Sequence, residues 1–179
     1  MNMDERPFAN VQEVKLSLIN PERIIRRGID LLRNRPMETS SWPVYRKIIK
    51  RMLLDLQPDT IHAHFGPMGA LISPVAKSLA IPLVVTFYGY DISEYALEDY
   101  WRAQYQELAK DADAVTVLSE QMKTEAVELG FYPGKTGVIH LGTDLSRFPK
   151  KSVNHPVRNF VSVGRLSEKK GHIDSIKSV

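Results

Sequence analysis

Cysteine is absent from this sequence of 179 residues, and so is any long apolar run. Without cysteine there are no disulfide bonds, thiol nucleophiles or sulfur-ligated zinc sites, which fits a reducing compartment. No apolar stretch approaches the ~20 residues that a membrane-spanning helix needs. Residues 1–10 are partly charged and have no apolar core, so we do not expect a secretory signal peptide. With 43% hydrophobic and 25% charged residues, the composition is that of a folded globular chain.

Several common nucleotide-binding and catalytic motifs are also missing. The sequence has neither the G-x-G-x-x-G fingerprint of dinucleotide sites nor the G-x-S-x-G nucleophile elbow. Residues 133–136, Pro-Gly-Lys-Thr, resemble the end of a phosphate-binding P-loop. However, the position where that loop needs its first glycine is Leu129, and the segment leads from a predicted helix into a predicted strand, the reverse of the P-loop order. We therefore reject a P-loop, and we find no convincing Ser/His/Asp set.

The segment 20–56 is rich in positive charge and is predicted to form two helices, Pro21–Asn34 and Val44–Leu56. Between Glu22 and Asp55 there are nine basic and four acidic residues, an excess of five positive charges, whereas the whole chain carries +3. Such a segment offers a cationic face to nucleic acid, an anionic membrane surface or an anionic substrate. The alternative is a solvated pair of helices with no such partner. The basic residues expected to point away from the apolar face of the second helix are Arg46, Lys47, Lys50 and Arg51.

From residue 58 onward, short apolar runs alternate with helical patterns. This alternation predicts right-handed crossovers and a parallel sheet, that is, an α/β fold with a Rossmann-like sheet and helices on both faces. The nearly continuous apolar run Ile81–Tyr88 is typical of a strand buried on both faces. The predicted strands are Thr60–Phe65, Ile81–Tyr88, Ala114–Leu118 and Thr136–Leu141, and the predicted helices are Met68–Leu79, Ile92–Lys110 and Met122–Leu129, the last capped by Ser119.

A second domain is predicted to begin near the end of the sequence. The polar stretch Val153–Arg158 has the composition of a linker. After it, Phe160–Val163 has the pattern of a new strand, and Gly171 leads into a helix. One strand and the start of one helix bury too little apolar surface to fold alone. We therefore expect an N-terminal domain over residues 1–155, followed over 156–179 by the linker and the first part of a second domain.

Polar residues at the carboxyl ends of the predicted strands are the first candidates for a site, because ligands of open α/β sheets bind in the crevice there. His62 and His64 share one face of a strand, which suggests a metal site. No third ligand lies at a metal-like spacing, so no metal is expected, and we interpret His64 as a hydrogen-bonding group in the crevice. After the next strand, Gly89 permits close approach of a ligand, and Asp91 either contacts that ligand or caps the following helix.

A short basic loop in the predicted second domain offers an anion site. Gly164 and Arg165 follow the predicted strand, and Lys170 precedes the helix that begins at Gly171. The free N–H groups of a helix N-terminus and two cationic side chains can together bind phosphate oxygens. The order of strand, loop and helix, more than the spacing, supports this interpretation.

Five segments, taken in order, resemble one known family. They are HAHFGPMGA (62–70), PLVVTFYGYDIS (82–93), DADAVTVLSEQM (111–122), GVIHLGTDLSRF (137–148) and FVSVGRLSEKKGH (160–172). Together they are similar to the retaining family 4 glycosyltransferases of the GT-B fold, particularly the bacterial branch that builds capsule, exopolysaccharide and lipopolysaccharide chains. Their order and spacing match over about two-thirds of the chain, and five ordered segments are far more specific than any one of them.

The resemblance implies two Rossmann-like lobes that face each other across a cleft, the N-terminal lobe for the acceptor and the C-terminal lobe for a nucleotide-sugar donor. Arg165 and Lys170, with Gly164, would bind the donor diphosphate and stabilise it as it leaves, without a metal ion or other cofactor. The resemblance also implies a cytoplasmic enzyme that meets glycan or lipid-linked acceptors at the inner face of the cell membrane, and no nucleic-acid partner. The expected catalytic residues are Tyr88 and His64, and the expected substrate-binding residues are Gly66, Gly89, Asp91, Ser119 and Glu120.

Three features depart from the family pattern. Residues before Gly28 offer neither the opening strand nor its glycine-rich loop, and the paired glutamates of the second lobe would lie beyond Val179. Both features predict a fragment that does not turn over alone. Tyr88 stands where many relatives have histidine, and a phenol with an unperturbed pKa of about 10 is a poor base at neutral pH. The alternative to a glycosyltransferase is a non-catalytic α/β module that docks a membrane surface or an anionic partner through its basic helices.

Overall fold

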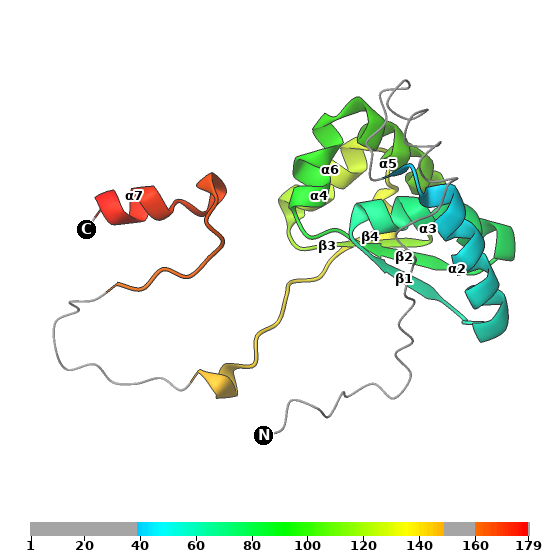
Figure 1. The fold of residues 1–179 in the computed structure, drawn as a ribbon, viewed down its shortest axis with the longest axis horizontal. Helices are drawn as coiled ribbons and strands as arrows, with labels where there is room; N and C mark the ends of the chain where they lie inside the picture. The colour runs from blue at the N-terminus through cyan, green and yellow to red at the C-terminus, as the bar shows by residue number, and fades with distance from the viewer. Residues whose placement is uncertain (1–38, 149–159, 179) are drawn as a thin grey trace. The chain divides into compact units, whose positions relative to one another are not determined.

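The computed structural model describes residues 39–148 and 160–178. Their contacts divide the chain into two compact units, with the boundary between Leu141 and Gly142. The first unit contains a four-stranded parallel sheet with the strand order β1-β2-β3-β4 (Figure 1), which confirms the predicted α/β fold with its parallel, Rossmann-like sheet. The strands are β1 Ile61–His64, β2 Leu83–Thr86, β3 Ala114–Val117 and β4 Thr136–Val138, each shorter than predicted.

The register of the sheet separates an apolar face from a polar one. Ala63 pairs with Val85, and Val85 pairs with Val115, so these buried side chains form an apolar row across three strands. One residue further along, His64 pairs with Thr86, and Thr86 pairs with Thr116. Because side chains alternate along a strand, this second row lies on the opposite face of the sheet, at the carboxyl ends of its strands.

The helices of the first unit cover the apolar face. They are α2 Trp42–Leu56, α3 Gly66–Leu79, α4 Tyr90–Ser93, α5 Asp99–Asp111 and α6 Glu120–Glu128. Helix α3 packs on β1 and β2, α6 packs on β3 and β4, and α2 and α5 pack on α3. Sequential strand order with right-handed crossovers puts successive helices on the same side of a sheet. The described helices accordingly lie on one face (Figure 1), whereas helices on both faces were predicted.

Two glycines on α3 allow the helix to approach the sheet and α5 closely. A Cβ atom at Gly66 would lie 2.3 Å from Cε1 of Phe87 and 2.8 Å from Cζ of Tyr105, and both of these aromatic side chains are fully buried. At Gly69 a Cβ would lie 2.9 Å from Cγ1 of Val85. The core of this unit therefore depends on the absence of a side chain at the start of α3.

The predicted long helix Ile92–Lys110 is wrong, because the chain breaks within it. Helix α4 is followed by a 3₁₀ turn, Tyr95–Leu97, and by Glu98 in an extended conformation (φ −81°, ψ 128°), and α5 then begins at Asp99. The break brings the ring of Tyr95 parallel to that of Trp101, at 5.2 Å between centroids and 9° between planes. Neither glycine nor proline marks the break in the sequence.

The basic residues of α2 do not all point away from the core. Arg46 donates from Nε to the carbonyl of Leu71 (2.8 Å) and from Nη2 to that of Ala70 (3.0 Å), so its predicted outward orientation is wrong. Its guanidinium also lies 5.3 Å from the ring centroid of Trp42, and burial lowers its pKa. Helix α3 has the acceptors that attract this side chain inward. Lys47, Lys50 and Arg51 are exposed, as predicted.

The second unit contains short helical elements in its described residues. These are the 3₁₀ turns Leu145–Arg147 and Glu168–Lys170 and helix α7 His172–Lys177, which confirms the predicted helix after Gly171. The predicted strand Phe160–Val163 is wrong. Val161 and Val163 are 87% and 93% exposed, and an apolar run forms a strand only where a partner strand accepts its hydrogen bonds. The predicted helix Pro21–Asn34, the linker 153–158 and the domain boundary at residue 155 lie outside the described residues.

Candidate functional site

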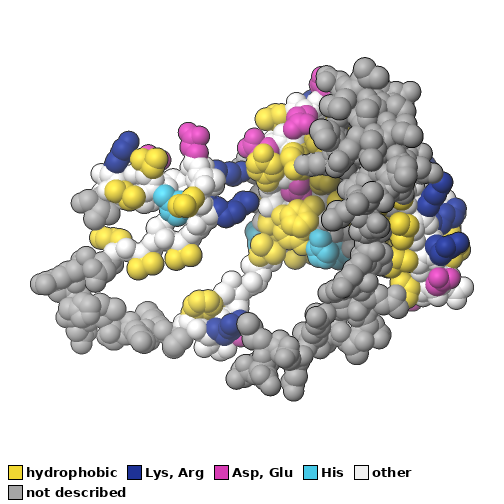
Figure 2. Space-filling model, viewed as in Figure 1, with side chains coloured by type: hydrophobic (Ala, Val, Ile, Leu, Met, Phe, Trp, Pro, Cys, Tyr) yellow, Lys and Arg dark blue, Asp and Glu magenta, His cyan; other side chains and the backbone are white. Residues whose placement is uncertain are grey.

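The loops after β1 and β2 meet at the carboxyl edge of the sheet and bring the two predicted catalytic residues together. His64 ends β1, and Tyr88 lies two residues beyond β2. Nδ1 of His64 is 2.5 Å from the hydroxyl oxygen of Tyr88, and the two rings stack with 5.9 Å between centroids. Histidine and hydrophobic side chains lie side by side on this part of the surface (Figure 2). The phenol and imidazole therefore form a hydrogen-bonded pair at the place where sheets of this class bind ligands.

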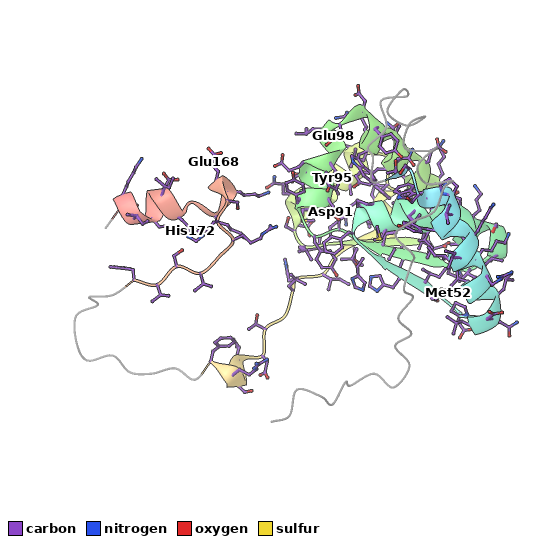
Figure 3. The ribbon with its side chains drawn as sticks, viewed as in Figure 1. Met52, Asp91, Tyr95, Glu98, Glu168 and His172 are labelled. Atoms are coloured by element: carbon purple, nitrogen blue, oxygen red, sulfur yellow. The ribbon has the colours of Figure 1, made fainter. Side chains whose placement is uncertain are left out.

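Asp91, labelled on α4 in Figure 3, joins the same two loops through its carboxylate. Its carboxylate accepts from the backbone N–H of Gly66 through Oδ2 and from that of Tyr88 through Oδ1, each at 2.9 Å. Asp91 is 4% exposed, and its carbonyl accepts the hydroxyl of Tyr105 at 2.7 Å. Gly89, not Asp91, is the N-cap of α4, so the predicted capping role is wrong. Asp91 instead fixes the position of both loops, and a direct contact with substrate stays a prediction.

A chain of hydrogen bonds on the polar face of the sheet was not predicted. Nε2 of His62 lies 2.7 Å from Oγ1 of Thr86, which lies 2.5 Å from Oγ1 of Thr116. The His62 ring also stacks on that of His64, with 4.4 Å between centroids. Partial burial, and then the neighbouring His64, lower the pKa of His62. The alternation of side chains along each strand could have predicted this chain of hydrogen bonds, because it puts both threonines on the same face as the histidines.

The histidine pair has no metal-binding partners in the described part of the chain. No cluster of three or more histidine, aspartate or glutamate side chains there is arranged as metal ligands. Nε2 of His62 is bonded to Thr86, and Nδ1 of His64 is bonded to Tyr88. These two ring nitrogens are therefore engaged in hydrogen bonds within the protein.

The remaining predicted substrate-binding residues lie in the loops after β2 and β3. Gly89 has φ +120°, and a Cβ there would meet no atom within 4 Å, so its backbone is open to a ligand. The hydroxyl of Ser119 accepts from the backbone N–H of Met122 at 3.2 Å, which confirms it as the cap of α6. Glu120 is the exposed first residue of that helix. Substrate contacts by Gly89, Ser119 and Glu120 stay predictions.

In the second unit, the predicted phosphate loop is organised around His172 (Figure 3). Nε2 of His172 lies 3.1 Å from the carbonyl oxygen of Arg165, and a Cβ at Gly164 would lie 3.3 Å from the same nitrogen and 3.6 Å from Cγ of Lys170. The hollow of about 630 Å³ beside the loop is lined by Leu166, Ser167, Glu168, Gly171, His172, Ile173 and Asp174. The two predicted cations are not among these residues, so diphosphate binding by Arg165 and Lys170 stays a prediction.

None of the helices in the described ranges is both long enough and apolar enough to cross a bilayer. The parallel sheet and the helices packed on it define a Rossmann-like α/β domain of the kind found in the N-terminal lobe of GT-B proteins.

Comparison with known proteins identifies the family. The model of Glycosyltransferase Family 4 matches residues 4–147, and the chain belongs to this family, as the resemblance of its motifs predicted. Over 117 residues, 63% of this chain, it is 32% identical to WcaL of Salmonella typhimurium, which is named as a colanic acid biosynthesis glycosyltransferase. Over 177 residues, 86% of this chain, it is 30% identical to TuaC of Bacillus subtilis, which is named as a teichuronic acid biosynthesis glycosyltransferase. These alignments span 29% of WcaL and 44% of TuaC.

Proposed function

We propose that this chain is the acceptor-side part of a glycosyltransferase that builds a cell-surface polysaccharide. The enzyme takes a sugar from a nucleotide-sugar donor and adds it, with retention, to a glycan or lipid-linked acceptor. The observation that carries the proposal is the hydrogen-bonded pair of His64 and Tyr88 at the carboxyl edge of a family 4 sheet. The names of WcaL and TuaC, which refer to two surface polysaccharides, support the polysaccharide class.

The proposed roles follow from the chemistry of the side chains. The pair of His64 and Tyr88 presents a hydroxyl and an imidazole to the hydroxyl groups of a sugar, and Asp91 holds the loops that carry them. The hydroxyl of Tyr88 can donate and accept hydrogen bonds, so its proposed role is to position a substrate hydroxyl. Arg165 and Lys170 supply positive charge to the departing diphosphate, which needs charge stabilisation as it leaves. With these cations we propose no metal ion.

Sugar transfer by the protein that contains this chain tests the proposal. Labelled UDP-, GDP- and dTDP-sugars are offered with an oligosaccharide or a lipid-linked acceptor, and the labelled product is counted. Arg165→Ala and Lys170→Ala should each lower kcat/KM roughly 10- to 150-fold, the effect of losing about 1.5–3 kcal/mol of a charged hydrogen bond. Lys177→Ala, which removes a charge at the end of α7, is the matched control. Unchanged turnover in both loop variants would refute the donor-loop assignment.

The exposed cations of α2 support a peripheral location on the inner face of the cell membrane. Lys47, Lys50 and Arg51 gather along the outer side of the helix, where Figure 2 shows basic side chains together. Each basic residue near an anionic surface contributes on the order of 1 kcal/mol, and salt screens the effect. We expect co-sedimentation with vesicles that contain phosphatidylglycerol at low salt, and none with phosphatidylcholine alone.

Reversing the charge of the exposed basic residues on α2 distinguishes membrane docking from a basic surface that contacts only solvent. Lys47→Glu, Lys50→Glu and Arg51→Glu together should abolish vesicle binding, whereas Lys123→Glu on α6 should leave it intact. Arg46 is excluded from the set because its side chain holds α2 to α3. Equal binding to both kinds of vesicle, or binding to neither, would contradict the docking proposal. If the chain binds vesicles but the protein that contains it transfers no sugar, the chain is the non-catalytic docking module.

A further inference from the structure

Phe65 is held in a backbone conformation that a large side chain rarely adopts. Its φ is +72° with ψ 139°, it sits between β1 and α3, and its side chain is 50% exposed. Positive φ is a genuine outlier for a bulky residue, and such outliers persist only where the surroundings enforce them. Half-exposure also limits what the phenyl ring contributes to the core. Glycine would fit this backbone better, so the ring itself needs an explanation.

The surrounding hydrogen bonds show what enforces the conformation. The N–H of Phe65 donates to the carbonyl of Thr86 at 2.8 Å, which continues the pairing of β1 with β2. Its carbonyl accepts from the N–H groups of Met68 and Gly69 at the start of α3. The next residue, Gly66, is fixed by the carboxylate of Asp91. With both sides of Phe65 fixed, the backbone places its side chain against Tyr88 at the carboxyl edge of the sheet.

Phe65 extends the pair of His64 and Tyr88 into an aromatic platform, defined here as these three side chains. The ring centroids of Phe65 and Tyr88 are 4.7 Å apart and their planes are tilted by 45°. Tyr88 stacks in turn on His64, to which its hydroxyl is hydrogen-bonded. The platform therefore combines an apolar aromatic surface with a hydroxyl and an imidazole nitrogen at its edge.

We propose that Phe65 and Tyr88 stack against the apolar face of a pyranose ring of the acceptor, and that Phe65 is a specificity-determining residue for acceptor binding. A pyranose has a face of C–H groups and a rim of hydroxyls. The negative face of an aromatic ring attracts such C–H groups, and the hydroxyl and imidazole at the platform's edge match the rim. Neither Phe65 nor Tyr88, the two rings in closest contact, carries a cationic group that could bind a phosphate. A neutral sugar suits it better than a phosphate. The inference rests on the proposed function and names the substrate class of the same site.

Saturation-transfer NMR on the whole chain tests the platform directly. The probes are the methyl glycosides of glucose, galactose and mannose at millimolar concentration, with uridine as the competing flat ligand. We expect saturation of the ring C–H protons of at least one glycoside, with upfield shifts caused by the aromatic ring current. Phe65→Leu should weaken the saturation about threefold to tenfold, the range for losing one aromatic contact. Phe65→Tyr should retain it.

Two further variants control for folding and for non-specific contact. Phe148→Leu makes the same chemical change at another exposed phenylalanine, in the second unit, and should leave the saturation unchanged. Phe65→Gly should raise the Tm, since glycine accepts a positive φ, and should still abolish sugar saturation. No saturation with any of the three glycosides, equal saturation in Phe65→Leu, or binding of uridine alone would overturn the proposal. Sugar binding that depends on Phe65, in a protein without transfer activity, would uphold the platform and refute the proposed enzyme.

Discussion

Replacing Gly66 with alanine tests the packing that holds the candidate site in place. The added Cβ would lie 2.3 Å from Cε1 of Phe87 and 2.8 Å from both Cζ and the hydroxyl oxygen of Tyr105. Carbon atoms in van der Waals contact are about 3.5–4.0 Å apart, so at least one ring must move by more than 1 Å. Both aromatic residues have 0% exposure, and each packs against the other edge-on at 5.4 Å between centroids. The rings therefore have no free space to enter.

The expected cost combines overpacking with a lost hydrogen bond. Forcing an extra methyl group into a packed core costs about 1–3 kcal/mol. A shift of Tyr105 also strains the bond from its hydroxyl to the carbonyl of Asp91, a contribution of about 1 kcal/mol. Gly66→Ala should thus destabilise the first unit by about 2–4 kcal/mol. For a unit of about 100 residues, each kcal/mol lowers the Tm by about 4–8 °C, which gives a fall of about 8–30 °C.

Thermal unfolding followed by circular dichroism measures the effect, with Gly137→Ala as the matched control. Gly137 is an exposed residue of β4, and a Cβ there would meet no atom within 4 Å. Its backbone has no positive φ, so alanine should leave the Tm unchanged or raise it slightly. If Gly66→Ala melts within about 2 °C of the unmodified chain, the close approach of α3 to the two rings is not rigid and the reasoning fails.

Two substitutions test the polar contacts that fix the site and the basic helix. Asp91→Asn leaves one side-chain acceptor for two backbone donors. It should therefore lower the free energy of unfolding, measured in urea, by about 1–3 kcal/mol. The control, Glu98→Gln at the exposed residue before α5, should change this free energy little. Arg46→Met should cost a similar amount because it removes both bonds to α3, whereas Lys47→Met, one residue further along the same helix, should stay within about 0.5 kcal/mol. Equal effects of each change and its control would contradict the assigned contacts.

Local patterns were sufficient to predict the sheet and part of the site. Apolar runs bounded by glycine and proline mark the strands, and their alternation with helical patterns requires parallel pairing. Because parallel strands end at one edge, the residues just past β1 and β2 were candidates for a site, and the hydrogen bond between His64 and Tyr88 joins one residue from each strand end. The topology of the sheet brings the two side chains to the same edge.

Contacts between distant segments account for what was not predicted. Arg46 turns inward because carbonyl groups 24 and 25 residues later accept its N–H groups, and the local pattern of α2 carries no sign of them. Phe65 takes a positive φ because β2 and α3 fix it on both sides. The run Phe160–Val163 has a strand-like sequence but no partner strand among the described residues of its unit. The periodicity of apolar residues indicates which secondary structure a segment favours, and tertiary contacts decide whether that structure forms.

The pH dependence of stability tests the hydrogen-bonded row behind the site. Partial burial and the nearby His64 lower the pKa of His62 from its usual value of 6.5. In the native chain His62 therefore binds its proton less readily than in the unfolded chain, so the unfolded state holds more protons below pH 6.5 and stability rises with pH there. The stabilisation by neutral His62 is complete above pH 6.5 and is lost as the pH falls through the lowered pKa.

Urea midpoints measured from pH 7.5 to 5 should fall more steeply for the unmodified chain than for His62→Gln, which does not titrate. His140→Gln, at an exposed histidine bonded to the carbonyl of Leu118, should keep the steep slope. Equal slopes for the unmodified chain and His62→Gln would show that the row does not depend on a neutral imidazole.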